Sequence, residues 1–117
     1  MRIAPEIIER LPPGFENEVR RARLHSGHLA RLLTSLAGAS AIVFGRRIFL
    51  ATSTDPGEEL LAHELTHVRQ YGRYGMAAFL GRYVGEYLAG RLSGAPHRDA
   101  YLGISFEREA ERAARSL

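Results

Sequence analysis

Residues 39–72, ASAIVFGRRIFLATSTDPGEELLAHELTHVRQYG, change their hydrophobic period partway along and so indicate two kinds of secondary structure. Two short apolar runs, residues 42–44 and 48–50, stand on either side of a glycine-containing turn at residues 45–47. Runs of this kind around such a turn predict a β-hairpin. The next segment opens with an aspartate that can cap a helix and a proline that suits its first turn, which predicts a helix over residues 55–72.

The rest of the chain predicts three more helices and a loop. A helical period over residues 16–37 predicts one long N-terminal helix, residues 74–92 a helix that packs on the others, and residues 105–117 a final amphipathic helix. The stretch 93–104, with glycine and proline near its start, reads as a loop. In the N-terminal helix the apolar stripe consists of Val19, Ala22, Leu29, Leu32, Leu33 and Leu36. We therefore expect an α+β fold in a single domain over residues 1–117.

Composition excludes several classes of protein. The chain has 117 residues, 45% of them hydrophobic and 25% charged, as in ordinary globular domains. No apolar run approaches the roughly 20 residues that span a membrane, and we expect a cytoplasmic protein because the first residues do not resemble a secretory signal. All 16 basic residues are arginine, but they are scattered among glutamates, which argues against a nucleic-acid surface. Without cysteine, a metal would bind through histidine and carboxylates.

His63, Glu64 and His67 form an HExxH motif within the predicted helix 55–72. Residues four apart lie on one face of a helix, with Cβ atoms about 5–6 Å from each other, so the two imidazoles can bind one zinc ion. Glu64 lies about 100° around the helix from His63, which suits a base that takes a proton from a zinc-bound water rather than a ligand. The alternative is a pair of ordinary polar histidines at the edge of the core.

A catalytic zinc needs a third protein ligand, and the sequence offers two candidates. His97 lies in the predicted loop. Glu107 lies on the last helix beside its apolar face, where a carboxylate needs a partner. We favour Glu107 over His97 for this reason. The apolar face of that helix comprises Phe106, Ala110, Ala113, Ala114 and Leu117.

The motif LLAHELTHVRQ followed by FEREAERAA resembles the gluzincin metallopeptidases, in which a glutamate on a later helix joins HExxH. More narrowly, GRRIFLATSTDPGEELLAHELTHVRQYG resembles the short metallopeptidase domains associated with bacterial contractile injection systems. The resemblance runs from about residue 20 to residue 114. It implies a small zincin-like domain with zinc as its cofactor and a peptide or protein as its substrate.

The resemblance also implies a role for individual residues. His63, His67 and Glu107 would be the ligands and Glu64 the base. Glu111, four residues after the ligand glutamate, stands where related enzymes carry an acid that hydrogen-bonds a zinc histidine. In such folds the strand before the motif helix pairs with the extended substrate. The substrate would therefore lie along Phe49 and Leu50.

We therefore expect a zinc-dependent metallopeptidase that hydrolyses peptide bonds. A donor for the developing oxyanion is also needed, and the sequence leaves six candidates: Tyr71, Tyr74, Tyr83, Tyr87, Tyr101 and His97. The competing hypothesis is a catalytically silent, zinc-binding scaffold that packs in a larger assembly. Because so short a chain builds only a small cleft, substrate recognition in the peptidase would depend on a partner or on self-association.

Overall fold

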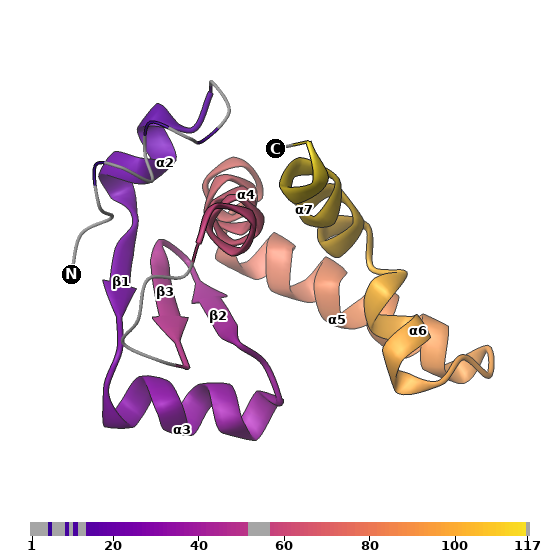
Figure 1. Cartoon of the computed structure of the whole chain (residues 1–117). Helices are drawn as coiled ribbons and strands as arrows, with labels where there is room; N and C mark the ends of the chain where they lie inside the picture. The colour runs from indigo at the N-terminus through magenta and orange to yellow at the C-terminus, as the bar shows by residue number, and fades with distance from the viewer. Residues whose placement is uncertain (1–4, 6–8, 10, 12–13, 52–56, 117) are drawn as a thin grey trace.

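The computed structural model describes residues 5, 9, 11, 14–51 and 57–116. The elements follow the order α2 (Glu16–Arg21), β1 (Arg23–His25), α3 (His28–Ala37), β2 (Ala41–Phe44), β3 (Arg47–Leu50), α4 (Glu58–Tyr74), α5 (Met76–Leu92), α6 (His97–Leu102) and α7 (Ser105–Arg115). This is the expected α+β fold (Figure 1). Among the described residues, no helix combines the length and the apolar character needed to cross a membrane.

The predicted hairpin is confirmed as β2 and β3, which pair antiparallel. Phe44 is paired with Arg47, so the turn contains two residues rather than three. Gly45 adopts a φ of 67°, which a residue without a side chain reaches without strain. The order of the sheet is β1-β3-β2, with β1 parallel to β3, so β3 is the central strand.

The expected single helix over residues 16–37 is wrong. The chain leaves the helical conformation after α2 and forms β1, where Leu24 pairs with Ile48 and is only 4% exposed. Gly27, with a φ of 116°, then starts α3. The apolar period was compatible with a helix, but pairing with β3 satisfies the backbone of β1 and buries Leu24 against the core.

Half of the predicted apolar stripe of this region is exposed to solvent. In α3 the buried residues are Ala30 and Thr34, and the Thr34 hydroxyl donates a hydrogen bond to the carbonyl of Ala30 at 2.8 Å. Leu29, Leu32 and Leu36 are exposed instead. The short helix therefore packs on the sheet mainly through Ala30 and Thr34, while three of its four leucines are exposed and Leu33 is half-buried.

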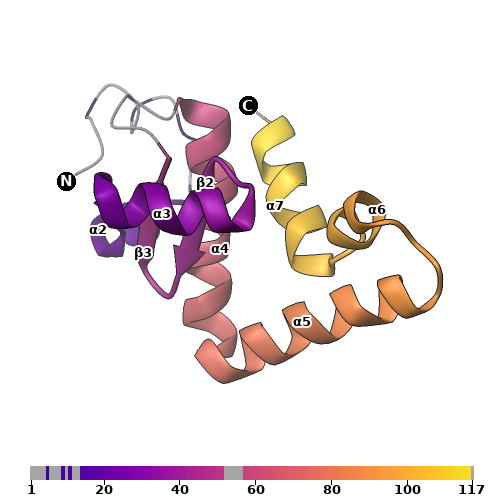
Figure 2. The ribbon, with the colours of Figure 1, turned by 90° about the horizontal axis from the view of Figure 1, so that it is seen from below.

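Helix α4 lies between the sheet and α7, and both neighbours bury it (Figures 1 and 2). One core cluster joins the sheet to the face of α4 that carries Leu61, Leu65 and Val68. The opposite side of α4 makes an extensive contact with α7. The predicted start of this helix at residues 55 and 56 lies outside the described residues, and the described part begins at Glu58 and ends at Tyr74.

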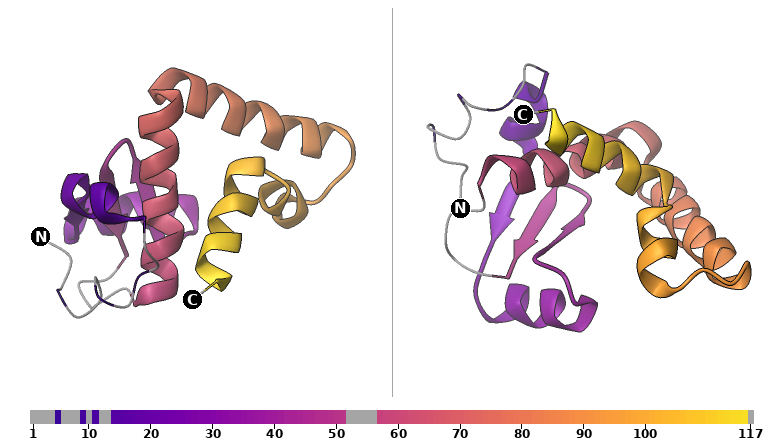
Figure 3. Two further views of the ribbon diagram at one scale, coloured as in Figure 1. Left: turned by 90° about the horizontal axis from the view of Figure 1, so that it is seen from above. Right: turned by 45° about the vertical axis from the view of Figure 1, so that its right-hand side comes forward.

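Helices α5, α6 and α7 form the other half of the molecule. Helix α5 turns away from the end of α4, and α6 leads back into α7, which runs beside α4 (Figure 3). The expected loop over residues 93–104 in fact contains α6, which packs against α5. A second core cluster fills this half and contains Tyr71, Phe79, Ile104 and Phe106. The apolar face of α7 is confirmed for its described members, and Leu117 lies outside the described residues.

The two leucine environments allow a matched test of this packing. Leu61→Ala, at a side chain 1% exposed, should lower the free energy of unfolding by about 2–5 kcal/mol, because the mutation leaves a cavity between α4 and the sheet. Leu32→Ala, at a side chain 55% exposed on α3, should change it by less than about 0.5 kcal/mol. Urea denaturation followed by circular dichroism measures both. Equal losses for the two variants would contradict the described burial of the leucines.

Candidate metal centre

The two histidines of the motif occupy adjacent turns of α4 on the face that meets α7. Their ring centroids are 5.1 Å apart, and His67 is the more deeply buried of the two, at 5% exposed. The Nε2 atoms of both rings point at one carboxylate oxygen, Oε1 of Glu107. The distances are 2.8 Å from His63 and 3.0 Å from His67. The i, i+4 spacing in the helix thus produces the convergence that the sequence predicted.

Glu107 reaches this point from the first turn of α7 and is only 5% exposed. Its second oxygen, Oε2, accepts a hydrogen bond from the Tyr83 hydroxyl at 2.5 Å. Burial alone would raise the pKa of Glu107, but the hydrogen bonds from His63, His67 and Tyr83 outweigh it and hold the pKa well below its usual range. The carboxylate is therefore kept ionised inside the protein.

Nitrogen atoms of His63 and His67 and an oxygen of Glu107 lie within 4.8 Å of one another. Two imidazole nitrogens and one carboxylate oxygen are the ligand set of one class of catalytic zinc site, and the sequence contains no thiol that would compete. The three residues therefore fit a divalent metal ion. Glu107 rather than His97 joins the histidines, as the sequence analysis favoured.

Each ligand histidine also contacts an oxygen through its other ring nitrogen. His67 Nδ1 lies 2.8 Å from Oε1 of Gln70, and His63 Nδ1 lies 3.5 Å from Oε2 of Glu111. Oxygens at this position orient metal-binding imidazoles in proteins. Glu111 stands where the resemblance placed it, although its carboxylate also accepts a hydrogen bond from Arg115. Sequence reasoning missed Gln70, whose signal was its place three residues after His67 on the same face of the helix.

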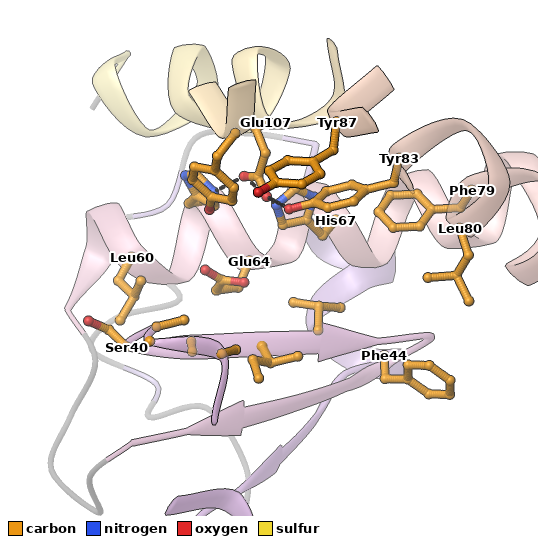
Figure 4. A pocket seen from close by; sticks show the side chains of 18 of the residues that line it. Ser40, Phe44, Leu60, Glu64, His67, Phe79, Leu80, Tyr83, Tyr87 and Glu107 are labelled. Carbon is orange, nitrogen blue, oxygen red and sulfur yellow. Dashed lines mark hydrogen bonds and ion pairs between the residues drawn. The ribbon is translucent and has the colours of Figure 1, made fainter. Parts of the chain in front are cut away.

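Glu64 lies on α4 beside the ligands and faces the gap between that helix and the sheet (Figure 4). It is 7% exposed. Burial raises its pKa, and the neighbouring His67 and His63 offset only part of this effect. Glu64 is not one of the three clustered ligands. A carboxylate with a raised pKa beside a metal site is suited to accepting a proton and giving it back.

A cavity of about 790 Å³ opens beside Glu64 and the cluster. One wall is β2 with the residues just before it, and the other is formed by side chains of α5 and α6. Its lining is mainly aliphatic and aromatic and includes Ile42, Val43, Phe44, Phe79, Leu80 and Tyr83 (Figure 4). The cavity therefore offers an apolar channel that leads to the carboxylate of Glu64.

The five tyrosines separate into different environments. Tyr71 donates a hydrogen bond to the carbonyl of Val43 at 3.2 Å, and burial raises the pKa of Tyr71 to about 12. Tyr74 packs against the ring of Phe106 and does not line the cavity. Like Tyr71, the other three tyrosines line the cavity, and two of them, Tyr83 and Tyr101, have their pKa raised by burial and by the charge of Glu107.

The sequence was compared with known protein families. Residues 2–75 match the eCIS core domain, where eCIS denotes the extracellular contractile injection system. The chain belongs to the eCIS core domain family. The matched range includes the HExxH helix and ends before Glu107. Searches of curated proteins and of solved structures gave no match.

Two details of the structure differ from the sequence analysis. His97 is the first residue of α6, and its Nδ1 lies 2.7 Å from the Tyr87 hydroxyl, away from the cluster. Strand β3 pairs with β2 along its whole length and with β1 as far as Phe49, which leaves no free edge for an extended substrate beside Phe49. Leu50 is buried in the core and the Phe49 ring stacks on His25, and neither lines the cavity. The difference arises because β1 occupies the edge that a two-stranded hairpin would have left open.

The hydrogen bond from Tyr83 to Glu107 can be tested by removing one oxygen atom. Tyr83→Phe should weaken zinc binding by about 10- to 100-fold, because the Glu107 carboxylate loses the donor that fixes its orientation. Tyr87→Phe is the matched control, since the Tyr87 hydroxyl contacts His97 rather than Glu107. Competition with a chromophoric chelator measures both affinities. A loss of the same size in both variants would mean that the contact with Glu107 has no special role.

Proposed function

We propose that this eCIS core domain is a zinc-dependent peptidase in which His63, His67 and Glu107 hold the metal and Glu64 is the general base. The observation that carries the proposal is the convergence of three buried ligand atoms beside a carboxylate whose pKa is raised by burial. Zinc, when bound, would supply Lewis acidity that polarises a carbonyl and lowers the pKa of water. Nitrogen and carboxylate ligands without sulfur support zinc over softer metals.

Glu64 would move the proton in this reaction. Its carboxylate would accept a proton from the attacking water and later donate it to the amine nitrogen of the departing peptide. Burial that raises the pKa of Glu64 supports the first half of this role, because a more basic carboxylate accepts the proton more readily. Its place at the cavity, on the side of α4 that faces β2, leaves it accessible to a substrate (Figure 4).

The substrate would bind along β2 rather than β3. Of the strands described, β2 lies at one edge of the sheet and is paired only with β3. An extended peptide could therefore add to it through backbone hydrogen bonds. The facing wall carries Phe79, Leu80 and Tyr83, so we expect a preference for large apolar side chains beside the cleaved bond.

A second candidate function is a zinc-binding scaffold without catalysis. It is favoured by apolar side chains that the described chain leaves exposed on two helices. Helix α3 exposes Leu29, Leu32 and Leu36 at a helical spacing, and α5 exposes Val84, Leu88 and Leu92. Exposed apolar stripes of this kind mark surfaces that contact other proteins. The name of the family likewise supports a role within a contractile injection system.

Metal content tests the ligand assignment common to both candidates. Protein supplied with zinc should retain about one ion per chain after dialysis. Glu107→Ala should lose most of the metal because it removes a buried ligand, whereas His97→Ala should keep it because His97 pairs with Tyr87 outside the cluster. Elemental analysis measures the content. Retention in Glu107→Ala together with loss in His97→Ala would reverse the assignment.

Hydrolysis by a glutamine variant separates the two candidate functions. Glu64→Gln should keep zinc but lower peptide hydrolysis by about 10²–10⁴-fold, because the amide cannot accept the proton of water. The matched control is Glu59→Gln, an exposed glutamate of the same helix outside the cavity. Mass spectrometry of a diverse peptide library, and of the chain itself for self-cleavage, gives the rates. Zinc-loaded wild type that cleaves neither would favour the scaffold.

A further inference from the structure

Gln70 makes the most complete set of hydrogen bonds around the metal centre. It is 1% exposed and lies one turn after His67 on α4. Its Oε1 is 2.8 Å from His67 Nδ1. Its Nε2 donates to the backbone carbonyl of Phe106 at 3.1 Å and to Oε1 of Glu109 at 2.7 Å. One buried amide therefore contacts a ligand histidine on its own helix and two residues of α7.

These partners fix the orientation of the amide. The carbonyl of Phe106 and the carboxylate of Glu109 can only accept hydrogen bonds, so the NH₂ group of Gln70 must face them. A flipped amide would place its oxygen against two acceptors in a buried site. The oxygen of Gln70 must then face His67, and it too can only accept.

The orientation of the amide determines the chemistry of His67. Because Gln70 Oε1 accepts, His67 Nδ1 must carry a hydrogen, and the ring presents Nε2 to the cluster with Glu107. The corresponding contact of His63 is longer and more exposed. His63 Nδ1 lies 3.5 Å from Oε2 of Glu111, whose side chain is 45% exposed. His67 is thus the ligand whose ring is held by a buried partner.

The NH₂ group of Gln70 bears on the position of Glu107. Phe106, whose carbonyl accepts from Gln70, directly precedes Glu107 in the first turn of α7. The hydrogen bond therefore ties the backbone beside Glu107 to the helix that carries both histidines. Among the described helix pairs, α4 and α7 share the most extensive contact, which is where this amide lies.

We propose that Gln70 is a positioning residue of the metal centre, which directs Nε2 of His67 toward the metal and holds Glu107 at the distance needed to share it. The inference rests on the metal site of the proposed function and is independent of peptide hydrolysis. Gln70 touches neither substrate nor metal, and acts through His67 and Phe106.

Zinc affinity of a variant tests the proposal first. Gln70→Met keeps a side chain of similar size but removes the acceptor and both donor contacts, and it should weaken zinc binding by about 10- to 100-fold. Glu109→Gln is the matched control, because its amide oxygen can still accept from Gln70, and it should stay within about threefold of the wild type. Competition titrations give the affinities, and urea denaturation of the metal-free proteins shows whether folding has changed. Unchanged affinity in Gln70→Met would overturn the proposal.

A spectroscopic measurement on the wild type tests the same point without any variant. Gln70 is the only glutamine and Asn17 the only asparagine of the chain, so only two side-chain carboxamide NH₂ groups appear in a ¹⁵N-labelled sample. In the zinc-loaded protein we expect an exchange-protected Nδ1–H of His67, with the Gln70 side chain as its close neighbour. That signal should lose its protection in Gln70→Met. Zinc bound through Nδ1 of His67 would overturn the proposal, as would a His67 Nδ1–H that exchanges freely in the wild type.

The outcomes separate this proposal from the function on which it rests. Zinc-loaded wild type without peptidase activity removes the proposed catalysis and leaves the role of Gln70 intact. Wild type that binds no zinc overturns both. Wild type that binds zinc with an affinity insensitive to Gln70→Met overturns the positioning role alone.

Discussion

The buried carboxylate of Glu107 is the interaction on which the arrangement of the helices depends. An ionised carboxylate inside a protein is costly unless charged or polar groups surround it. Here imidazoles of α4 contact one of its oxygens and the phenol of Tyr83 on α5 contacts the other. The polypeptide must therefore return through α5 and α6 so that α7 lies against α4. A different course for these helices would leave Glu107 without partners.

The two halves of the molecule are stabilised by different kinds of packing. The sheet and one face of α4 share an apolar cluster, so the histidine helix is held by ordinary packing. The second cluster, which joins α5 and α7 to the end of α4, is mainly aromatic and adjoins the polar cluster. The family match covers the first half and ends at residue 75. The carboxylate that completes the cluster thus comes from the part of the chain beyond the match.

Local patterns in the sequence were sufficient for the features that depend on nearby residues. The HExxH spacing on one helix, the hairpin, and the glutamate beside the apolar face of α7 each follow from helix or strand geometry over a few residues. Two of the features that were missed depend on distant partners. Strand β1 exists because Leu24 meets Ile48, which lies 24 positions later, and that pairing also covers the edge of β3. Gln70 likewise became informative only when Phe106 and Glu109 were found beside it.

The composition of the interface between α4 and α7 argues that it serves more than stability. Packing alone would be satisfied by apolar residues, and replacing a buried ionic cluster with well-packed apolar side chains is often neutral or stabilising. This interface instead buries His67, Gln70 and Glu107, each at 5% exposure or less, with every one of them hydrogen-bonded. The second oxygen of Glu107 is also satisfied, by Tyr83. A network this completely paired holds its ligand atoms in one arrangement, and such an arrangement lowers the entropy lost when a metal ion binds. The polar interface is therefore better explained by ligand placement than by the stability of the fold.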